Sequence, residues 1–227
     1  AGVINVVVGS SASAIGNLLT QSPIIRKLTF TGSTPIGKQL LKQSADTVKK
    51  VSMELGGNAP VIVFEDADLD KAVAGAVASK YRNAGQTCIC ANRILVQDSI
   101  REAFVEKFTS AVKALKLGNG LDEAVNIGPL INKGALDDVE AMVQEALSQG
   151  AVATTGGKLA RQGSNFYEPT VLINVNDSMR VFREEIFGPV APIFSFKDEA
   201  DAIAQANDTE FGLASYFYTR DIGRAWR

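Results

Sequence analysis

The sequence predicts an α/β fold in two parts, and three observations support this prediction. Short apolar runs alternate with amphipathic segments of helical length, which is the rhythm of doubly wound α/β proteins. A glycine-rich turn over 32–38 stands between an expected strand and an expected helix. The run Gly56-Gly57-Asn58-Ala59-Pro60 then interrupts the pattern. We therefore expect one part over 1–55 and a second α/β part over 56–227.

The composition is that of an ordinary globular protein. The 227 residues are 46% hydrophobic and 21% charged, with a net charge of −2, so we expect a sizeable core and no nucleic-acid or membrane partner. No apolar run reaches the roughly 18 residues of a membrane helix, and no signal peptide is expected. Two cysteines predict a reducing, cytoplasmic location. The absence of histidine excludes a Cys–His or Ser–His pair, and no metal site is expected.

The first part is expected to contain three strands and two helices. The apolar run over 3–8 is closed by Gly9 and Ser10, and we expect a buried parallel strand there. The other expected elements are a short helix over 14–19, a strand over 25–31, a helix from the glycine-rich turn to about Ala45, and a strand over 48–53.

The second part repeats the alternation of strands and helices. Expected strands cover 61–64, 93–96, 167–175, 191–196 and 213–218, and expected helices cover 66–83, 100–115, 136–148 and 198–206. Acidic residues open the helix over 66–83, where they stabilise the helix dipole. The chain ends inside a further helical segment at Trp226 and Arg227.

The glycine-rich turn has features of a phosphate site. Gly32 lets the backbone approach a ligand closely, and Ser33 adds a hydroxyl at the start of a helix, where free N–H groups attract anions. The spacing is G-x-x-x-x-G, and Lys38 is followed by Gln39 where a P-loop has Ser or Thr. An ordinary strand-to-helix turn is the alternative interpretation.

Three further motifs place reactive side chains at turns. Glu54 ends an apolar strand and suits a general base, with a solvated loop carboxylate as the alternative. Cys88 and Cys90 follow an expected helix, and a thiolate is a strong nucleophile, although most free thiols are buried packing groups. Glu185 can hold ribose hydroxyls and Phe187 can flank a nicotinamide, and a charged helix start followed by a turn is the alternative.

Taken in order, the four motifs resemble those of the aldehyde dehydrogenase family. That family carries Phe-Thr-Gly-Ser, Glu-Leu-Gly-Gly, Gly-Gln-x-Cys and Glu-x-Phe-Gly-Pro, and all four occur here. Cys88 follows Glu54 by 34 residues, and Glu185 follows Cys88 by 97. The resemblance covers the whole chain. It implies an aldehyde dehydrogenase-like fold in which 1–55 is the C-terminal part of a Rossmann-like cofactor domain and 56–227 is a C-terminally truncated catalytic domain.

The resemblance also implies roles for individual residues. Cys88 is expected to be the nucleophile and Glu54 the general base of an enzyme that uses NAD or NADP. The expected cofactor contacts are Gly32 and Ser33 at the pyrophosphate, the Leu55 carbonyl at the nicotinamide amide, Glu185 at the nicotinamide ribose and Phe187 beside it.

The stretches 51–60, 81–90 and 204–212 resemble succinate-semialdehyde dehydrogenases in particular. In that subfamily an arginine six residues before the nucleophile binds the substrate carboxylate, and Arg82 holds this position. Six helical residues would rise about 9 Å, which suits a four-carbon semialdehyde. The implied reaction is oxidation of succinate semialdehyde to succinate. The alternatives are another aldehyde, such as glutarate semialdehyde, and a truncated noncatalytic fragment.

Two further expectations follow from the resemblance. Cys90 stands two residues after the nucleophile, as in redox-regulated members of the subfamily, so a reversible Cys88–Cys90 disulfide is expected, with a packing thiol as the alternative. The family's oxyanion asparagine, its adenine-ribose lysine and its oligomerisation strand have no counterpart among these residues. The resemblance implies a homo-oligomer for the full-length protein, and because these parts are missing we expect no turnover from the 227 residues alone.

Overall fold

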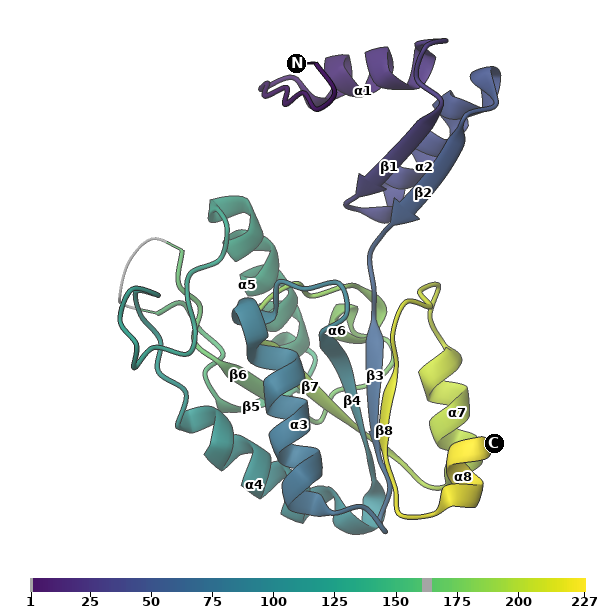
Figure 1. Cartoon of the computed structure of the whole chain (residues 1–227). Helices are drawn as coiled ribbons and strands as arrows, with labels where there is room; N and C mark the ends of the chain where they lie inside the picture. The colour runs from purple at the N-terminus through teal and green to yellow at the C-terminus, as the bar shows by residue number, and fades with distance from the viewer. Residues whose placement is uncertain (1, 161–164) are drawn as a thin grey trace. The chain divides into compact units, whose positions relative to one another are not determined.

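A computed structural model describes residues 2–160 and 165–227. The chain forms two compact units, Ala1–Gly56 and Gly57–Arg227, and passes from one to the other within the Gly56-Gly57 break (Figure 1). A cofactor-binding role for the first unit and a catalytic role for the second stay predictions.

The first unit is built on two parallel strands. β1 (Lys27–Thr31) and β2 (Lys50–Glu54) pair in register from Lys27↔Lys50 to Thr31↔Glu54. Helix α2 (Thr34–Ser44) and the short 3-10 helix η1 (Ala45–Thr47) connect the two strands, and α1 (Ala12–Gln21) precedes them. The connection is a β-α-β unit, as the sequence predicts, and it places the turn after β1 and the end of β2 at the same edge of the sheet.

A buried lysine fastens α1 to this unit. The Lys49 ammonium donates to the carbonyl oxygens of Leu19, Ser22 and Ile25 at 3.3, 2.9 and 3.1 Å. These carbonyls lie at the C-terminal end of α1 and just beyond it, where backbone acceptors lack partners within the helix.

The prediction of a buried strand over 3–8 is wrong. These residues belong to no helix or strand, and Val3 and Val8 are 93% and 91% exposed. A buried parallel strand needs neighbouring strands to satisfy its backbone groups, and β1 and β2 pair only with each other in this unit. Apolar composition alone therefore does not produce a strand here.

The second unit contains a six-stranded sheet of order β5-β6-β7-β4-β3-β8. All neighbouring pairs are parallel except β5 with β6. The strands are β3 (Ala59–Val63), β4 (Ala91–Gln97), β5 (Val152–Thr155), β6 (Thr170–Ile173), β7 (Val190–Phe196) and β8 (Tyr216–Tyr218). The sequence predicted five of these strands and missed β5, a four-residue strand of small and polar residues.

Helices cover both faces of this sheet. They are α3 (Leu69–Tyr81), α4 (Arg101–Lys113), α5 (Lys133–Ser148), α6 (Arg180–Arg183), α7 (Glu199–Asn207) and α8 (Ile222–Trp226), with 3-10 turns η2 (Arg82–Gly85) and η3 (Asp98–Ile100). The side chains of Asp68, Asn132 and Asp198 cap α3, α5 and α7 by accepting a backbone N–H from the first turn. The short helix α6 was not predicted.

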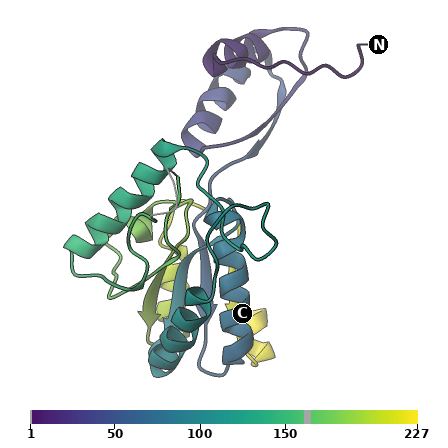
Figure 2. The ribbon, with the colours of Figure 1, turned by 90° about the vertical axis from the view of Figure 1, so that its left-hand side faces the viewer.

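Alternating side chains of the central strands separate two hydrophobic clusters. Ile94 and Val96 face Phe104 and Phe108 of α4, and α3 lies beside α4 in the same layer (Figure 2). Leu95 points the opposite way, into a second cluster that includes Ala202 of α7. The unit is therefore a three-layer α/β structure, because successive strand residues point to opposite faces.

Helix α3 ends earlier than the sequence predicts. The expected helix over 66–83 begins at Leu69 and stops at Tyr81. Asn83, Ala84 and Gly85 then adopt φ values of 53°, 56° and 77°. Such left-handed conformations break the helix and cost about 1 kcal/mol or more at a residue with a Cβ, such as Ala84.

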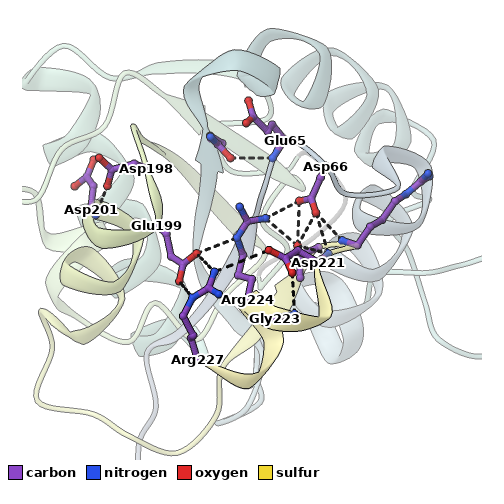
Figure 3. Close-up of polar contacts among 12 residues, drawn as sticks. Glu65, Asp66, Asp198, Glu199, Asp201, Asp221, Gly223, Arg224 and Arg227 are labelled. Atoms are coloured by element: carbon purple, nitrogen blue, oxygen red, sulfur yellow. Dashed lines mark hydrogen bonds and ion pairs between the residues drawn. The ribbon is translucent and has the colours of Figure 1, made fainter.

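The C-terminal segment is held by a network of charges. Asp66 accepts bonds from Thr219, from the backbone of Arg220 and Asp221, and from Arg224 (Figure 3). Arg224 also donates a hydrogen bond to Glu199 at 3.2 Å. The Arg227 guanidinium donates to both carboxylate oxygens of Glu199, each at 2.8 Å. Helix α8 is thereby tied to the loop after β3 and to the start of α7.

The described residues contain neither a membrane-spanning helix nor a metal-binding cluster. No helix in 2–160 or 165–227 is both long enough and apolar enough to cross a membrane. Over the same ranges, no group of three or more acidic or cysteine side chains is arranged to hold a metal ion.

Candidate active site

Within the first unit, the glycine-rich turn and the predicted base are neighbours. Thr31 and Glu54 are paired residues at the ends of β1 and β2, and Gly32 N–H donates to the Glu54 carbonyl at 3.0 Å. The pairing of β1 with β2 therefore fixes the predicted pyrophosphate turn next to the strand end that carries the predicted base.

The start of α2 has the hydrogen-bond donors that an anion-binding site needs. Ser33 precedes the helix with extended backbone angles, and its carbonyl accepts the Gly37 N–H at 3.0 Å. Its hydroxyl makes no capping bond, so it stays available beside the N–H groups of the first turn. The Leu55 side chain lies on α2 at Gly37, where an added Cβ would come within 2.3 Å of Leu55 Cδ2. A larger residue at 37 would therefore displace the end of the Leu55 side chain from this position.

Within the second unit, the predicted nucleophile lies in the cysteine turn, the residues 86–90 between η2 and β4. Cys88 is half-buried and Cys90 is buried, and both are free thiols. Cys90 N–H donates to Thr87 O at 3.0 Å, and Cys90 Sγ donates to Gly85 O at 3.1 Å. The Cys88 N–H has no acceptor among the residues that the structure describes. A backbone donor beside the predicted nucleophile is thus left unused.

Three side-chain hydrogen bonds connect this turn and the start of β4 to other parts of the unit. The Gln86 amide oxygen accepts the Ile131 N–H at 2.8 Å. The Tyr216 hydroxyl on β8 donates to the Ile89 carbonyl at 2.7 Å. Ser79 Oγ on α3 accepts the Ala91 N–H at 3.1 Å. The backbone on either side of Cys88 is therefore fixed to separate parts of the fold, as a reacting group requires.

Glycines bring three motifs into backbone contact. A Cβ at Gly57 would lie 2.1 Å from the Cys88 carbonyl oxygen, and a Cβ at Gly85 would lie 2.1 Å from the Gly188 carbonyl oxygen. Real Cβ atoms do not tolerate such distances, so only glycine permits either approach. The sequence around Gly57, the cysteine turn and the loop after Glu185 converge at this place.

Glu185 is held within this convergence. Its Oε1 accepts the Gly57 N–H at 2.9 Å, and Oε2 forms no hydrogen bond with any residue in the described part of the chain. Burial raises the pKa of Glu185, while the Gly57 N–H and the Lys80 ammonium act in the opposite direction. One oxygen anchors the side chain, and the other is available to a ligand hydroxyl.

A buried asparagine that the sequence interpretation missed positions Glu185. Asn92 Nδ2 donates to the Glu184 carbonyl at 2.8 Å, and Asn92 Oδ1 accepts the Ile186 N–H at 3.1 Å. The same side chain donates to Asn58 Oδ1 at 2.6 Å. Asn92 therefore holds both neighbours of Glu185 and links them to the Gly57-Asn58 segment. Its only signal in the sequence is an amide next to Arg93 just before the expected strand over 93–96.

Phe187 lies beside the cysteine turn in an unusual conformation. Its φ is 50°, and its side chain is 40% exposed. It lines a depression of about 450 Å³ together with Asn83, Gln86, Pro129, Leu130 and Ile131. Strained backbone of this kind persists where the surrounding structure fixes it, often at functional sites.

Arg82 is exposed at the end of α3 and has no hydrogen bond or ion pair with any described residue. The helical path expected from Arg82 to Cys88 is wrong, because the helix ends at Tyr81 and left-handed residues follow. A rise of six helical residues therefore does not describe how Arg82 relates to the thiol. Its role as a substrate contact stays a prediction.

The predicted site residues fall into two groups. Gly32, Ser33, Glu54 and Leu55 lie together in the first unit, and Arg82, Cys88, Cys90, Glu185 and Phe187 lie in the second. The structure brings the first group together, and in the second unit it brings Cys88, Cys90, Glu185 and Phe187 into one region, whereas Arg82 makes no side-chain contact with them among the described residues. The cofactor, base and nucleophile roles stay predictions, and so does the Cys88–Cys90 disulfide.

Comparison with known proteins supplies the family. The family model described as "Aldehyde dehydrogenase family" matches residues 1–227. The chain is 60% identical over 227 residues to an Escherichia coli protein named succinate-semialdehyde dehydrogenase (NADP(+)), covering 100% of this chain and 47% of that protein. It is 58% identical to a glutarate-semialdehyde dehydrogenase of Pseudomonas putida, with the same 100% and 47% coverage.

Solved structures agree with these matches. The crystal structure of succinate-semialdehyde dehydrogenase from Burkholderia pseudomallei superposes with a TM-score of 0.96 at 55% identity, over 97% of this chain and 46% of that one. The chain spans about half the length of the curated relatives it matches. The expected aldehyde dehydrogenase-like α/β fold is confirmed, and the chain belongs to the aldehyde dehydrogenase family.

Proposed function

We propose that the intact protein oxidises an aldehyde that carries a distal carboxylate, with succinate semialdehyde as the substrate and succinate as the product. The observation that carries the proposal is the convergence of the Cys88 turn, the Gly57 backbone and the Glu185 carboxylate in one unit. The Glu54 strand end lies two residues before Gly56 and belongs to the same continuous motif.

In this reaction the Cys88 thiolate adds to the aldehyde carbonyl carbon. The new C–S bond places negative charge on the former carbonyl oxygen. The Cys88 N–H, which has no acceptor in the described structure, donates a hydrogen bond to this oxyanion. The fixed backbone on both sides of Cys88 keeps this donor in place throughout the reaction.

Loss of a hydride from the tetrahedral carbon leaves a thioester on Cys88. Glu54 then takes a proton from a water molecule, and the resulting hydroxide attacks the thioester carbonyl. The C–S bond breaks, which releases the carboxylic acid and returns the Cys88 thiolate. Glu54 passes the proton that it took from water to the solvent. The end of a β-strand suits this role, because residues there are positioned by the sheet and still reach solvent.

The residues present fit a nicotinamide cofactor. Ser33 and the first-turn N–H groups of α2 suit a pyrophosphate, and the unbonded Oε2 of Glu185 suits a ribose hydroxyl. Phe187, in the second unit, offers a partly exposed ring beside Asn83 and beside Gln86 of the cysteine turn. NAD or NADP, when bound, supplies the acceptor for the hydride.

Arg82 supports a substrate with a distal carboxylate. Its side chain is exposed, has no partner within 2–160 and 165–227, and lies six residues before Cys88. A guanidinium that has no partner can bind both oxygens of a carboxylate. Glutarate semialdehyde is the second candidate, because a relative with that name is 58% identical over the whole chain.

The test compares aldehydes with and without a distal carboxylate in the intact protein. We expect kcat/KM for succinate semialdehyde to exceed that for butyraldehyde by about tenfold or more, the worth of one charge-assisted contact. Cys88→Ala should abolish oxidation of both aldehydes. If the Cys88→Ala variant still oxidises them, the proposed mechanism is wrong. If glutarate semialdehyde is the better substrate, the chain length of the proposed substrate is wrong.

The competing class of function is a noncatalytic protein that keeps the fold. Such a protein would bind NAD or NADP in a calorimetric titration and show no reduced cofactor on addition of any aldehyde. The proposed enzyme forms NADH or NADPH in step with aldehyde consumption.

A further inference from the structure

A chain of hydrogen bonds runs from a tyrosine on β8 to the backbone of Cys88. The Tyr216 hydroxyl donates to the Ile89 carbonyl at 2.7 Å, the usual length of an O–H···O bond. The N–H of the same peptide group, which belongs to Cys90, donates to the Thr87 carbonyl at 3.0 Å. The N–H of the Thr87–Cys88 peptide group belongs to Cys88, and no described residue accepts it. Two peptide groups therefore connect the tyrosine to the unused donor beside the predicted nucleophile.

All donors in this hydrogen-bond chain point the same way along it, so each bond can strengthen the next. A hydrogen bond to a carbonyl oxygen polarises the peptide group and makes its N–H a better donor, by about 10–30% per bond. The chain begins at the tyrosine hydroxyl and ends at the Cys88 N–H. That N–H is the donor that the proposed reaction directs at the oxyanion.

The sheet fixes the tyrosine relative to the cysteine turn. Tyr216 is the first residue of β8 and pairs with Val61 on β3, and β3 pairs in turn with β4 (Figure 1). Strand β4 begins at Ala91, directly after the cysteine turn. The Tyr216 side chain is half-buried and packs against the hydrophobic cluster that contains Ile94 and Val96. The position of its hydroxyl is therefore determined by the sheet and the core rather than by the turn that it bonds.

We propose that Tyr216 is a positioning residue for aldehyde oxidation, whose hydroxyl orients and polarises the Cys88 N–H through the two peptide groups of the hydrogen-bond chain. The proposal rests on the proposed function, because it takes the Cys88 N–H as a donor to the oxyanion. Tyr216 acts through the backbone and takes no part in making or breaking bonds. Its loss should weaken stabilisation of the oxyanion and leave the Cys88 thiolate as reactive as before.

The experiment compares two reactions of Cys88 in the intact protein, with and without Tyr216→Phe, which removes only the hydroxyl. Oxidation of succinate semialdehyde places negative charge on the carbonyl oxygen. Alkylation by iodoacetamide places none there, because the thiolate displaces iodide from carbon. We expect kcat/KM for the aldehyde to fall about three- to tenfold, the scale of one hydrogen bond in the transition state. The second-order rate constant of alkylation should stay unchanged.

The ratio of the two rate constants separates the proposal from a purely structural role. If Tyr216→Phe leaves the ratio of oxidation to alkylation constant, the tyrosine at most holds the turn, and the proposal is overturned. The fall in kcat/KM should be equal for succinate semialdehyde and butyraldehyde, because both form the same oxyanion. A fall confined to succinate semialdehyde would contradict the proposal. If the wild type oxidises neither aldehyde, or Cys88→Ala still oxidises them, the failure lies with the proposed function on which the proposal rests.

The matched control is Tyr218→Phe. It removes a hydroxyl from the same face of the same strand, two residues further on, where the hydroxyl lies against Gly75 of α3. Both rate constants should equal those of the wild type. A fall in kcat/KM as large as that of Tyr216→Phe would show that the bond to Ile89 is not the cause, and would contradict the proposal. Urea unfolding of both variants checks that they are folded under the assay conditions.

Discussion

The backbone N–H of Gly57 donates to Oε1 of Glu185 over 2.9 Å, across 128 positions of sequence. The same glycine lies so close to the Cys88 carbonyl that a Cβ would approach it to 2.1 Å. Gly57 therefore connects the predicted nucleophile turn with the predicted ribose-binding carboxylate. A change at this glycine should disturb both.

Gly57→Ala should destabilise the protein by about 1–3 kcal/mol, because the added Cβ displaces the backbone of the Cys88 turn. It should also raise the Kd for NAD or NADP by weakening the hold on Glu185. Urea unfolding and calorimetric titration measure the two effects. Gly128→Ala is the matched control, since no atom of the described residues, apart from its own chain neighbours, lies within 4 Å of its added Cβ. Equal effects of the two substitutions would show that Gly57 has no special role.

Asn92→Ala should cost about 2–4 kcal/mol of unfolding free energy, because it leaves the buried Glu184 carbonyl and Ile186 N–H without their partner. It should also weaken cofactor binding, since both neighbours of Glu185 lose their anchor. Asn207→Ala removes one exposed bond to Ile203 and should cost less than about 1 kcal/mol. A small loss of stability in Asn92→Ala, with unchanged cofactor affinity, would contradict this account.

The charge network around α8 predicts loss of stability in acid. Bonds from Arg227 and Arg224 lower the pKa of Glu199 from 4.5 to about 2. Burial alone would raise the pKa of Asp66, but bonds from Thr219, Arg220 and Asp221 and the Arg224 charge hold it below its usual value. Both carboxylates are depressed, so their stabilisation is complete above about pH 5 and is lost as the pH falls toward 2.

The measurement is urea unfolding at pH 7, 5, 4 and 3 for the wild type and for Asp66→Asn with Glu199→Gln. The double variant should be less stable at pH 7, and its stability should fall less between pH 5 and pH 3. Asp137→Asn, which removes a separate surface carboxylate paired with Lys133, should keep the acid sensitivity of the wild type. Parallel pH curves for the wild type and the double variant would exclude the network as a source of acid sensitivity.

Arg82→Ala should raise the KM for succinate semialdehyde by about 10- to 100-fold, with little change for butyraldehyde, because only the first substrate has a carboxylate for the guanidinium. Arg82→Lys should recover part of the loss, since an ammonium keeps the charge but not the two-bond contact. Arg101→Ala, at a half-buried arginine that begins α4, is the control. An equal rise in KM for both aldehydes would rule out a carboxylate contact.

Most of the fold was predictable from local pattern. Strands β3, β4 and β7 are short apolar runs bounded by polar or turn residues, and α5 and α7 begin at asparagine and aspartate caps that the sequence displays. The strand expected over 3–8 failed because pairing depends on partners elsewhere in the chain. The end of α3 was misplaced because Asn83 and Ala84 give weak local signals of left-handed backbone.

The site was predictable only in its motif residues. Cys88, Glu54 and Glu185 stand in recognisable short motifs, whereas Asn92 and Lys80 do not. Asn92 acts across 92 and 94 positions of sequence, and no local pattern predicts which carbonyl and N–H it will meet. Lys80 resembles the last lysine of an amphipathic helix, which is ordinarily exposed, but the structure buries it completely.

The most direct test of the central claim is the first turnover of Glu54→Gln in the intact protein, mixed rapidly with succinate semialdehyde and NADP+ or NAD+. The account predicts a burst of about one reduced cofactor per chain followed by slow turnover, because hydride loss precedes the water step that Glu54 assists. Mass spectrometry of the quenched protein should find a succinyl group on Cys88. Absence of the burst, or a succinyl group on any residue other than Cys88, would contradict the account.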